Sequence, residues 1–196
     1  MPTDAPSGSK PRLRREIRAR RGALSPAAAR AAAFSAVRRL WSLPCLARAR
    51  RLALYLPAPG ELDCTPLAVQ AWRRRRQVFL PVITGSTLRF APFHPGSDLR
   101  PNRFGIPEPV GPRRNWRNAR QLDVIVAPLV AFDVDGRRLG MGGGFYDRAL
   151  ARRSRARRPR FIGIAFEVQK VTKLPADAWD VPLDAVVTES ATYRFR

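Results

Sequence analysis

The chain has 196 residues, of which 45% are hydrophobic and 27% are charged. This length and composition fit one globular domain and exclude a disordered, collagen-like or coiled-coil chain. No apolar run approaches the roughly 20 residues of a membrane span, and no apolar core of a secretory signal follows the polar N-terminus. Because two cysteines, Cys45 and Cys64, cannot make a disulfide framework or a four-ligand zinc site, we expect a soluble protein of the reducing cytoplasm.

The unusual feature of the composition is its net charge of +22, from 37 Lys and Arg against 15 Asp and Glu. Such a charge favours contact with nucleic acid, an anionic membrane surface or anionic small ligands. Only three of the basic residues are lysines, and the arginines accompany runs of alanine and 19 prolines, as coding by a GC-rich genome produces. We therefore expect most arginines to occupy solvated positions, and we predict neither a specific nucleic-acid partner nor membrane binding.

Apolar periodicity predicts that helices and strands alternate along the chain. After a disordered lead at residues 1–9, a single domain is expected to cover residues 10–196. Helices are predicted at 10–23, 26–43, 65–75 and 145–153, and strands at 51–56, 77–82, 88–93, 123–127, 160–166 and 184–188. Two irregular segments are also predicted: a long functional loop or flap at 94–120 and a polar, Gly-rich turn at 133–142.

This alternation predicts an α/β fold, a three-layer sandwich with a mostly parallel central sheet and helices on both faces. In such folds, ligands bind beyond the carboxyl ends of the strands. The loops at 57–61 and 129–147 leave strands in that direction. We therefore expect the chemistry of the protein at these two loops.

A glycine-rich segment is the strongest local signal, with four glycines among the five residues 140–144. Between a buried strand and a helix, such a loop lets backbone N–H groups converge on a polyphosphate beside the positive end of the helix. The spacing matches neither a dinucleotide fingerprint nor a P-loop, and a flexible tight turn is the alternative interpretation. Arg138 before the loop and Asp147 after it favour the phosphate site, because an arginine neutralises phosphate and a carboxylate is a natural Mg²⁺ ligand.

Three further charged residues are candidates. Lys10 and Arg14, four residues apart, share one face of the first helix beside the apolar Leu13 and Ile17. They either reach inward to an anion or belong to a solvated face. Glu61, at a strand end, either accepts hydrogen bonds from an amino-substituted heterocycle or lies on the surface of a loop.

Together these residues resemble the 5-formyltetrahydrofolate cyclo-ligase family, also called 5,10-methenyltetrahydrofolate synthetases. The resemblance runs nearly from end to end, and the block from Arg138 to Asp147 is its most specific part. The other matching segments are Lys10-x-x-Leu13-Arg14, Tyr55-Leu56-Pro57, Gly60-Glu61-Leu62-Asp63, Phe79-Leu80-Pro81, Phe104-Gly-Ile-Pro-Glu-Pro109, Pro128 to Arg148 and Asp180-Val-Pro-Leu-Asp184.

The resemblance implies an ATP-dependent ligase that converts 5-formyltetrahydrofolate to 5,10-methenyltetrahydrofolate with release of ADP and phosphate. The formyl oxygen is a poor leaving group, so it is expected to become a phosphate before N10 closes the ring. Phosphoryl transfer of this kind needs positioning and charge neutralisation more than a protein nucleophile. The family resemblance also implies a cytoplasmic enzyme of one-carbon metabolism, and we expect a monomer.

The same resemblance implies the roles of individual residues. ATP is expected to contact Lys10, Arg14, Arg138, Leu139, Gly140, Met141, Gly142, Gly143, Gly144, Phe145 and Tyr146. The reduced folate is expected to contact Leu56, Glu61, Phe104, Met141, Gly144 and Phe145. Asp147 and Asp184 are expected to hold Mg²⁺.

Three alternatives remain open at this point. In these alternatives, the chain is an ATP-using enzyme of the same family with a different substrate, a basic RNA- or DNA-binding module, or a family member that binds folate without catalysis. The nucleic-acid alternative has no support from an RNP, helix-turn-helix or zinc signature in the sequence.

Overall fold

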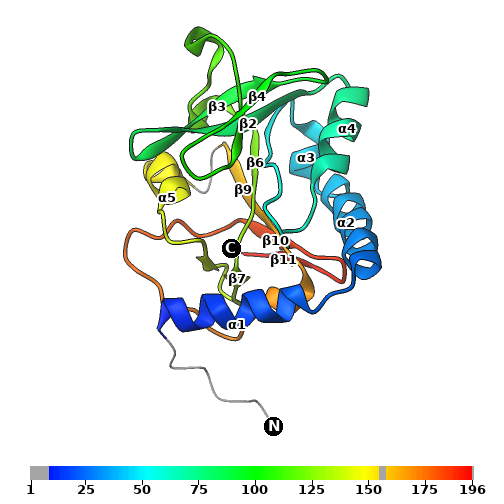
Figure 1. Ribbon diagram of the computed structural model, residues 1–196, viewed down its shortest axis with the longest axis vertical. Coiled ribbons are helices and arrows are strands. Elements are labelled where there is room, and N and C mark those ends of the chain that lie inside the picture. Colours follow the sequence, from blue (N-terminus) through cyan, green and yellow to red (C-terminus); the bar gives the residue numbers. More distant parts are fainter. Residues whose placement is uncertain (1–8, 155–157, 196) are drawn as a thin grey trace.

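The structure is a computed structural model that describes residues 9–154 and 158–195. Within these residues the chain forms a seven-stranded sheet of order β11-β10-β9-β6-β1-β2-β3 (Figure 1). Its strands are β1 (Arg51–Ala53), β2 (Gln77–Thr84), β3 (Thr87–Phe93), β6 (Val124–Ala127), β9 (Arg160–Ile164), β10 (Ala185–Val187) and β11 (Thr192–Arg194). The five inner strands are parallel, and the two edge strands β3 and β11 are antiparallel to their neighbours.

Helices cover both faces of this sheet. One face carries α2 (Pro26–Trp41), α3 (Pro44–Arg48) and α4 (Thr65–Arg73) over an apolar core that includes Leu40, Leu52 and Val124. The opposite face carries α5 (Phe145–Leu150), η2 (Ala119–Gln121) and a second core around Phe79, Ile125 and Phe161. The predicted three-layer α/β fold with a mostly parallel sheet is confirmed.

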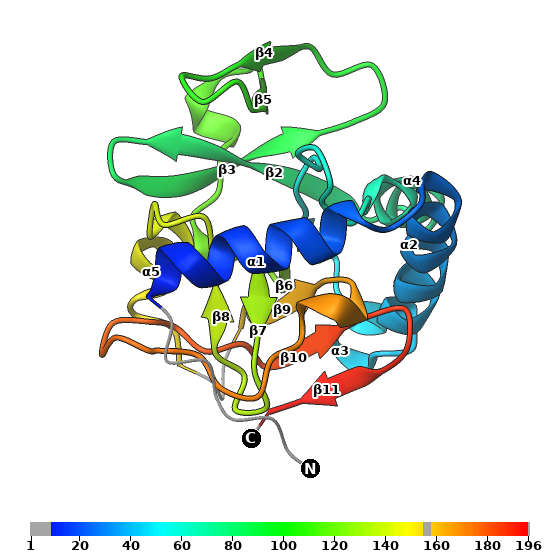
Figure 2. The ribbon, with the colours of Figure 1, turned by 60° about the horizontal axis from the view of Figure 1, so that its bottom comes forward.

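The first helix lies apart from these two layers. Figure 2 shows α1 (Lys10–Gly22) lying across the small hairpin of β7 (Ala131–Phe132) and β8 (Arg138–Leu139). Leu13 and Ile17 fasten it there, because both side chains are buried in a third apolar cluster with Val130 and Leu139. Most of the arginines of α1 lie on its other, exposed side.

Local sequence explains why the long helices begin where they do. Ser25 precedes α2, and its hydroxyl accepts a hydrogen bond of 3.2 Å from the N–H of Ala28, while Pro26 occupies the first helical position. The buried Ala33, Ala36, Val37 and Leu40 then recur at helical spacing toward the sheet.

Several predicted segments differ in detail from the structure. Pro44, predicted only to end a helix, also begins α3, because proline is tolerated at a first helical position. The predicted loop at 94–120 contains a hairpin of β4 (Leu99–Pro101) and β5 (Pro107–Pro109) and two short helical turns, η1 (Arg113–Asn115) and η2. The turn at 133–142 contains β8, while η3 (Glu167–Gln169) and β11 were not predicted.

The topology places the two loops of interest side by side. Strands β1 and β6 are parallel neighbours, with Leu52 opposite Val124, so the chain leaves both strands at the same edge of the sheet. One exit leads through Glu61 to α4, and the other leads through the β7–β8 hairpin and the glycine loop to α5. Residues 1–8, most of the predicted lead, lie outside the described residues. In the part of the chain that is described, no helix combines the length and apolarity needed to cross a membrane.

Candidate active site

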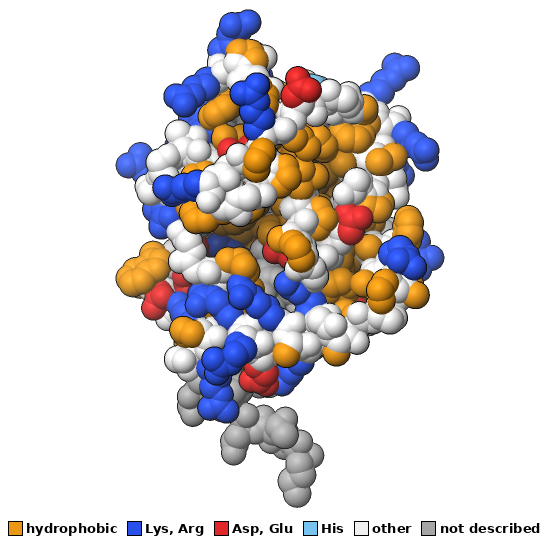
Figure 3. All heavy atoms as spheres, in the orientation of Figure 1, with side chains coloured by type: hydrophobic (Ala, Val, Ile, Leu, Met, Phe, Trp, Pro, Cys, Tyr) orange, Lys and Arg blue, Asp and Glu red, His pale blue; other side chains and the backbone are white. Residues whose placement is uncertain are grey.

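Helix α1 bridges the two loops at the carboxyl edge of the sheet. The Nε atom of Arg14 donates a hydrogen bond of 2.8 Å to the carbonyl oxygen of Gly140, and Arg18 lies 2.9 Å from the sulfur of Met141. At the end of the helix, the guanidinium of Arg21 lies beside Gly60. Figure 3 shows basic side chains gathered on this face over the part of the molecule where α1 lies.

The glycine loop has a backbone that other residues adopt only with strain. Gly142 has φ +104° and Gly144, which precedes α5, has φ +63°. A Cβ on Gly142 would lie 3.4 Å from the Arg14 guanidinium, and one on Gly143 would lie 2.7 Å from the Phe145 ring. Glycine is therefore favoured by the positive φ of Gly142 and Gly144 and by the closeness of the Phe145 ring to Gly143.

Arg138 and Asp147, predicted to serve ATP and metal separately, form an ion pair with each other. An Nη2–Oδ1 distance of 2.7 Å joins them, and their side chains are only 6% and 18% exposed. The backbone of Val181 completes the arrangement: its N–H donates to Asp147 over 3.0 Å, and its carbonyl accepts from Arg138. Arg138 also lies over the Phe161 ring at 4.6 Å, so it is fixed from several directions.

Lys10 reaches a segment that was not predicted to belong to the site. Its Nζ atom lies 2.5 Å from Asp177 and 3.6 Å from Asp180. The hydrogen bond to Asp177 is the main cause that raises the pKa of Lys10. The residues Asp177, Asp180 and Val181, called here the 177–181 segment, thus contact Lys10, Arg138 and Asp147 at once. Asp180 belongs to a motif that the sequence showed, but nothing in that motif indicated these partners.

The loop at 57–61 supplies a carboxylate beside α1. Glu61 accepts a hydrogen bond of 3.0 Å from the N–H of Ala58, which aims its side chain. Burial raises the pKa of Glu61, and the N–H of Ala58 and the charges of Arg21 and Arg18 oppose this rise. Nearby, Leu56 is half-buried at the edge of the main core.

Aromatic residues from three segments complete the site. Phe104, in the β4–β5 hairpin, is 56% exposed and makes an edge-on contact with Phe145 at a centroid distance of 6.1 Å. Tyr146 stacks on Phe161 at 5.9 Å. Burial raises the pKa of the Tyr146 hydroxyl well above its ordinary value, and the charge of Glu61 raises it further. The hydroxyl therefore stays protonated at neutral pH.

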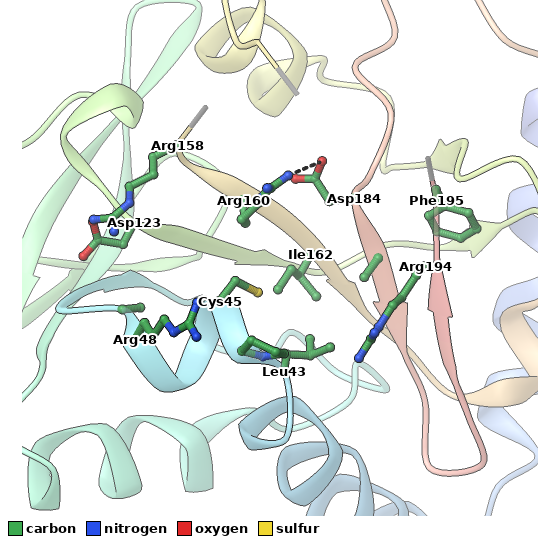
Figure 4. Close-up of a pocket in the computed structure, with 13 residues that line it drawn as sticks. Leu43, Cys45, Arg48, Asp123, Arg158, Arg160, Ile162, Asp184, Arg194 and Phe195 are labelled. Atoms are coloured by element: carbon green, nitrogen blue, oxygen red, sulfur yellow. Dashed lines mark hydrogen bonds and ion pairs between the residues drawn. The ribbon is translucent and has the colours of Figure 1, made fainter. Parts of the chain in front are cut away.

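Asp184 lies at the amino ends of the parallel strands, on the side opposite to their carboxyl ends, and it directly precedes β10. It pairs with Arg153 at 2.6 Å and accepts a hydrogen bond of 2.7 Å from the N–H of Phe161. Figure 4 shows it beside Arg160 in a cavity of about 540 Å³ at the amino ends of the strands. Asp147 and Asp184 thus have different arginine partners, Arg138 and Arg153. Among the described residues, no group of three or more His, Cys, Asp or Glu is arranged to hold a metal ion.

The structure brings together most residues that the sequence singled out. Lys10, Arg14, Glu61, the glycine loop, Phe145 and Arg138 surround one region between α1, α5 and the carboxyl ends of β1 and β6. Arg18 and Arg21 were missed, although their spacing was a usable signal. Both continue the face of α1 that Lys10 and Arg14 begin.

Solved structures of the same architecture define the class of protein. A 5,10-methenyltetrahydrofolate synthetase of Aquifex aeolicus superposes with a TM-score of 0.83 and 36% identity, over 95% of this chain and 93% of that one. A 5,10-methenyltetrahydrofolate synthetase of Mycoplasma pneumoniae superposes with a TM-score of 0.73 and 26% identity, over 93% of this chain and 99% of that one. The fold is therefore that of the α/β 5,10-methenyltetrahydrofolate synthetases.

The sequence comparison is more specific. Residues 6–189 match the 5-formyltetrahydrofolate cyclo-ligase family. The chain is 42% identical over 182 residues to the 5-formyltetrahydrofolate cyclo-ligase of Escherichia coli K12, which covers 91% of this chain and all of that protein. It is also 37% identical to the enzyme of that name from Haemophilus influenzae, over 87% of this chain and 92% of that one. The chain belongs to the 5-formyltetrahydrofolate cyclo-ligase family, and the predicted family and enzyme class are confirmed.

Proposed function

We propose that the protein uses ATP to close the formyl group of 5-formyltetrahydrofolate onto N10, which gives 5,10-methenyltetrahydrofolate, ADP and phosphate. The observation that carries this proposal is the bridge that α1 makes between the glycine loop and the Glu61 loop. Arg14 contacts the first loop and Arg21 the second, so a phosphate site and a heterocycle site lie along one helix. Family membership makes a reduced folate the natural second substrate.

The phosphate side of the site is formed by α1 and the glycine loop. Lys10 and Arg14 neutralise the phosphates, and the backbone from Leu139 to Tyr146 surrounds the nucleotide beside the start of α5. Arg138 is buried against Asp147. We therefore infer that it supports the base of this site and adds positive charge beneath the phosphates. Phosphoryl transfer depends mainly on such positioning and charge neutralisation.

The folate side is formed by the Glu61 loop and the aromatic residues. Glu61 accepts hydrogen bonds from the pteridine N–H groups, while Leu56, Met141, Gly144 and the Phe104–Phe145 contact enclose the ring and its neighbouring atoms. The formyl oxygen then faces the γ-phosphate. Its attack on the γ-phosphorus forms a phosphate ester and breaks the bond to ADP, which leaves; N10 then adds to the activated carbon and loses its proton, and the carbon–oxygen bond breaks as phosphate departs.

Magnesium fits this site through one carboxylate. The Oδ1 atom of Asp147 accepts the hydrogen bonds of Arg138 and Val181, and no described residue donates one to Oδ2, so we infer that Oδ2 is available to a cation beside the glycine loop. Mg²⁺ usually takes one or two protein carboxylates together with substrate phosphates, and when bound it neutralises phosphate charge. The second expected ligand, Asp184, accepts hydrogen bonds from the guanidinium of Arg153 and the N–H of Phe161.

The setting of the protein completes the proposal. We propose a cytoplasmic monomer without a specific nucleic-acid partner. Support comes from the seven-stranded sheet with its packed core, from the arginines spread over exposed positions of several elements, and from the ligase family to which the chain belongs.

One assay tests the function. Purified protein is mixed with 5-formyltetrahydrofolate and Mg-ATP, and methenyl absorbance and ADP are followed together. We expect both products in equal amounts, and the Lys10→Ala/Arg14→Ala variant to make neither at a comparable rate. Arg12→Ala/Arg15→Ala, which removes two exposed arginines of the same helix, is the control and keeps its activity. ADP without the methenyl product would show a different substrate, and folate binding without either product would show loss of catalysis.

A further inference from the structure

Arg21 is the buried arginine of α1. Arg21 as a whole is only 9% exposed, whereas Arg12, Arg15, Arg18 and Arg20 of the same helix are exposed. In the described part of the chain, its guanidinium makes no hydrogen bond and has no carboxylate within 4 Å. Most of the Arg21 residue is removed from water, and a cation in such a place is favoured where a nearby charge or ligand compensates it.

The guanidinium is directed at the turn that carries Glu61. Gly60 has φ +75°, and a Cβ placed on it would lie 3.5 Å from Nε of Arg21. A side chain here would meet the guanidinium at an ordinary van der Waals distance, so the guanidinium lies directly against the turn, and the positive φ is what favours glycine. Beside Gly60, the Glu61 carboxylate is held by the N–H of Ala58 rather than by Arg21 itself. Arg21 therefore acts on Glu61 through space and through the backbone of the turn.

The electrostatics of the two residues are reciprocal. Burial lowers the pKa of Arg21, and the charge of Glu61 opposes that change. Burial raises the pKa of Glu61, and the charges of Arg21 and Arg18 oppose it. The other titratable groups that face this place are Tyr55, Cys64 and Tyr146, and burial raises the pKa of each so that they stay neutral at neutral pH. Arg21 is thus the buried counter-charge nearest to Glu61 from α1.

We propose that Arg21 is a positioning residue for folate recognition, which acts as the buried counter-charge of Glu61 and holds the Gly60–Glu61 turn against α1. This role rests on the proposed function, in which Glu61 accepts hydrogen bonds from the pteridine. An ionised Glu61 accepts these bonds at all of its lone pairs, whereas a protonated one loses part of this capacity and presents a proton to the same donors. Arg21 does not touch the nucleotide region, so its effect is specific to the folate.

The first test compares two neighbouring arginines. Arg21→Gln is expected to weaken equilibrium binding of 5-formyltetrahydrofolate by about tenfold, as is typical for coupled groups in one network, with ATP affinity unchanged. Arg20→Gln is the matched control, because Arg20 is exposed and pairs only with Glu16 at 2.5 Å. Arg21→Lys keeps the charge and is expected to recover most of the folate affinity. Equal folate affinity in Arg21→Gln and Arg20→Gln would overturn the proposal.

A double-mutant cycle tests whether Arg21 acts through Glu61. In a Glu61→Gln background, Arg21→Gln is expected to change folate affinity by less than about twofold, because no carboxylate is left to be positioned. The pH dependence gives a second signature: without Arg21 the pKa of Glu61 rises, so the loss of binding on acidification moves to higher pH. An undiminished effect of Arg21→Gln in the Glu61→Gln background, or an unmoved pH profile, contradicts the proposal.

Thermal unfolding separates this inference from the proposed function. Glu61→Gln removes the charge that compensates Arg21, so its melting temperature is expected to fall, and Arg21→Gln/Glu61→Gln is expected to recover part of the loss. This comparison needs no folate and remains informative if Arg21→Gln alone does not fold. Failure of the wild type to bind folate would refute the proposed function, whereas a Glu61→Gln protein as stable as the wild type would refute the pairing.

Discussion

The Nζ atom of Lys10 lies 2.5 Å from Oδ2 of Asp177, and this ion pair joins the first turn of α1 to the 177–181 segment. The two side chains are 28% and 43% exposed. Exposed ion pairs contribute only about 0–1 kcal/mol to stability, since solvent screens them. The contact therefore orients Lys10 more than it stabilises the fold, and we expect a phosphate oxygen to replace Asp177 at little cost.

Lys10→Ala is accordingly expected to impair catalysis and spare stability. Loss of one charge-assisted phosphate contact costs about 1.5–3 kcal/mol, which lowers kcat/KM for ATP roughly 10- to 150-fold. The free energy of unfolding, measured in urea, is expected to change little, because Lys10 is the first residue of its helix. Arg12→Ala, at an exposed position of the same turn, is the control. A Lys10→Ala enzyme as active as the wild type would remove Lys10 from the site.

The net charge of +22 leads to a prediction about nucleic acid. If the arginines mainly occupy solvated positions, the protein binds random RNA or DNA weakly, without sequence preference and with a steep loss of affinity as salt rises. Fluorescence anisotropy with oligonucleotides of several sequences, measured from low to physiological salt, gives these quantities. A sequence-specific complex that survives physiological salt would favour the nucleic-acid-binding alternative.

Much of the framework was predictable because its signals are local. The cap and proline at Ser25 and Pro26 mark the start of α2, and four glycines before Phe145 mark the loop before α5. Short elements are harder to predict, since β8 and β11 span only two and three residues, too few to show the alternating pattern of a strand, although each pairs with a nearby strand. The alternation pattern alone does not specify such pairing.

The partners of the charged residues were not predictable from spacing. Arg138 and Asp147 are nine residues apart, and the chain between them turns through the glycine loop before they meet in one ion pair. Asp177 and Asp180 contact Lys10 although more than 160 residues separate them from it in the sequence. Helical or strand periodicity predicts nothing about residues that are so far apart along the chain. The sequence therefore indicates which residues carry the chemistry, while the tertiary structure decides which of them neutralise each other.

We expect Asp147 to serve as a metal ligand, and Asp147→Asn tests this expectation. An amide keeps the hydrogen bond from Val181 but removes the anionic oxygen that Mg²⁺ prefers. We expect turnover at limiting Mg²⁺ to fall severely and excess Mg²⁺ to restore part of the rate. Because the variant also leaves Arg138 without its counter-ion, urea unfolding must be measured beside the kinetics. Wild-type turnover at limiting Mg²⁺ would show that the glycine loop binds its phosphates without this metal contact.

Asp184 gives the sharpest contrast between a metal ligand and a structural anion. Its carboxylate faces the guanidinium of Arg153, whose side chain is only 2% exposed, and Arg153 in turn lies over the Phe161 ring at 5.9 Å. Removing one partner of a buried ion pair leaves the other charge uncompensated, at a cost of about 3–5 kcal/mol. If this pairing is the main role of Asp184, Asp184→Asn lowers the urea midpoint strongly, and added Mg²⁺ does not restore it.

The family resemblance implies the opposite pattern for the same substitution. A metal ligand at position 184 predicts a folded Asp184→Asn protein whose turnover at limiting Mg²⁺ is low and rises with excess Mg²⁺, as for Asp147→Asn. Urea unfolding and the Mg²⁺ dependence of the rate, measured on one preparation, separate the two outcomes. Asp135→Asn is the matched control, because Asp135 is exposed and pairs with Arg137 at 2.6 Å, so its loss costs little. We expect the stability of Asp184→Asn to fall well below that of Asp135→Asn, because the partner of Asp184 is buried and the partner of Asp135 remains in solvent. An Asp184→Asn protein as stable as the control but dependent on high Mg²⁺ would instead establish Asp184 as a metal ligand.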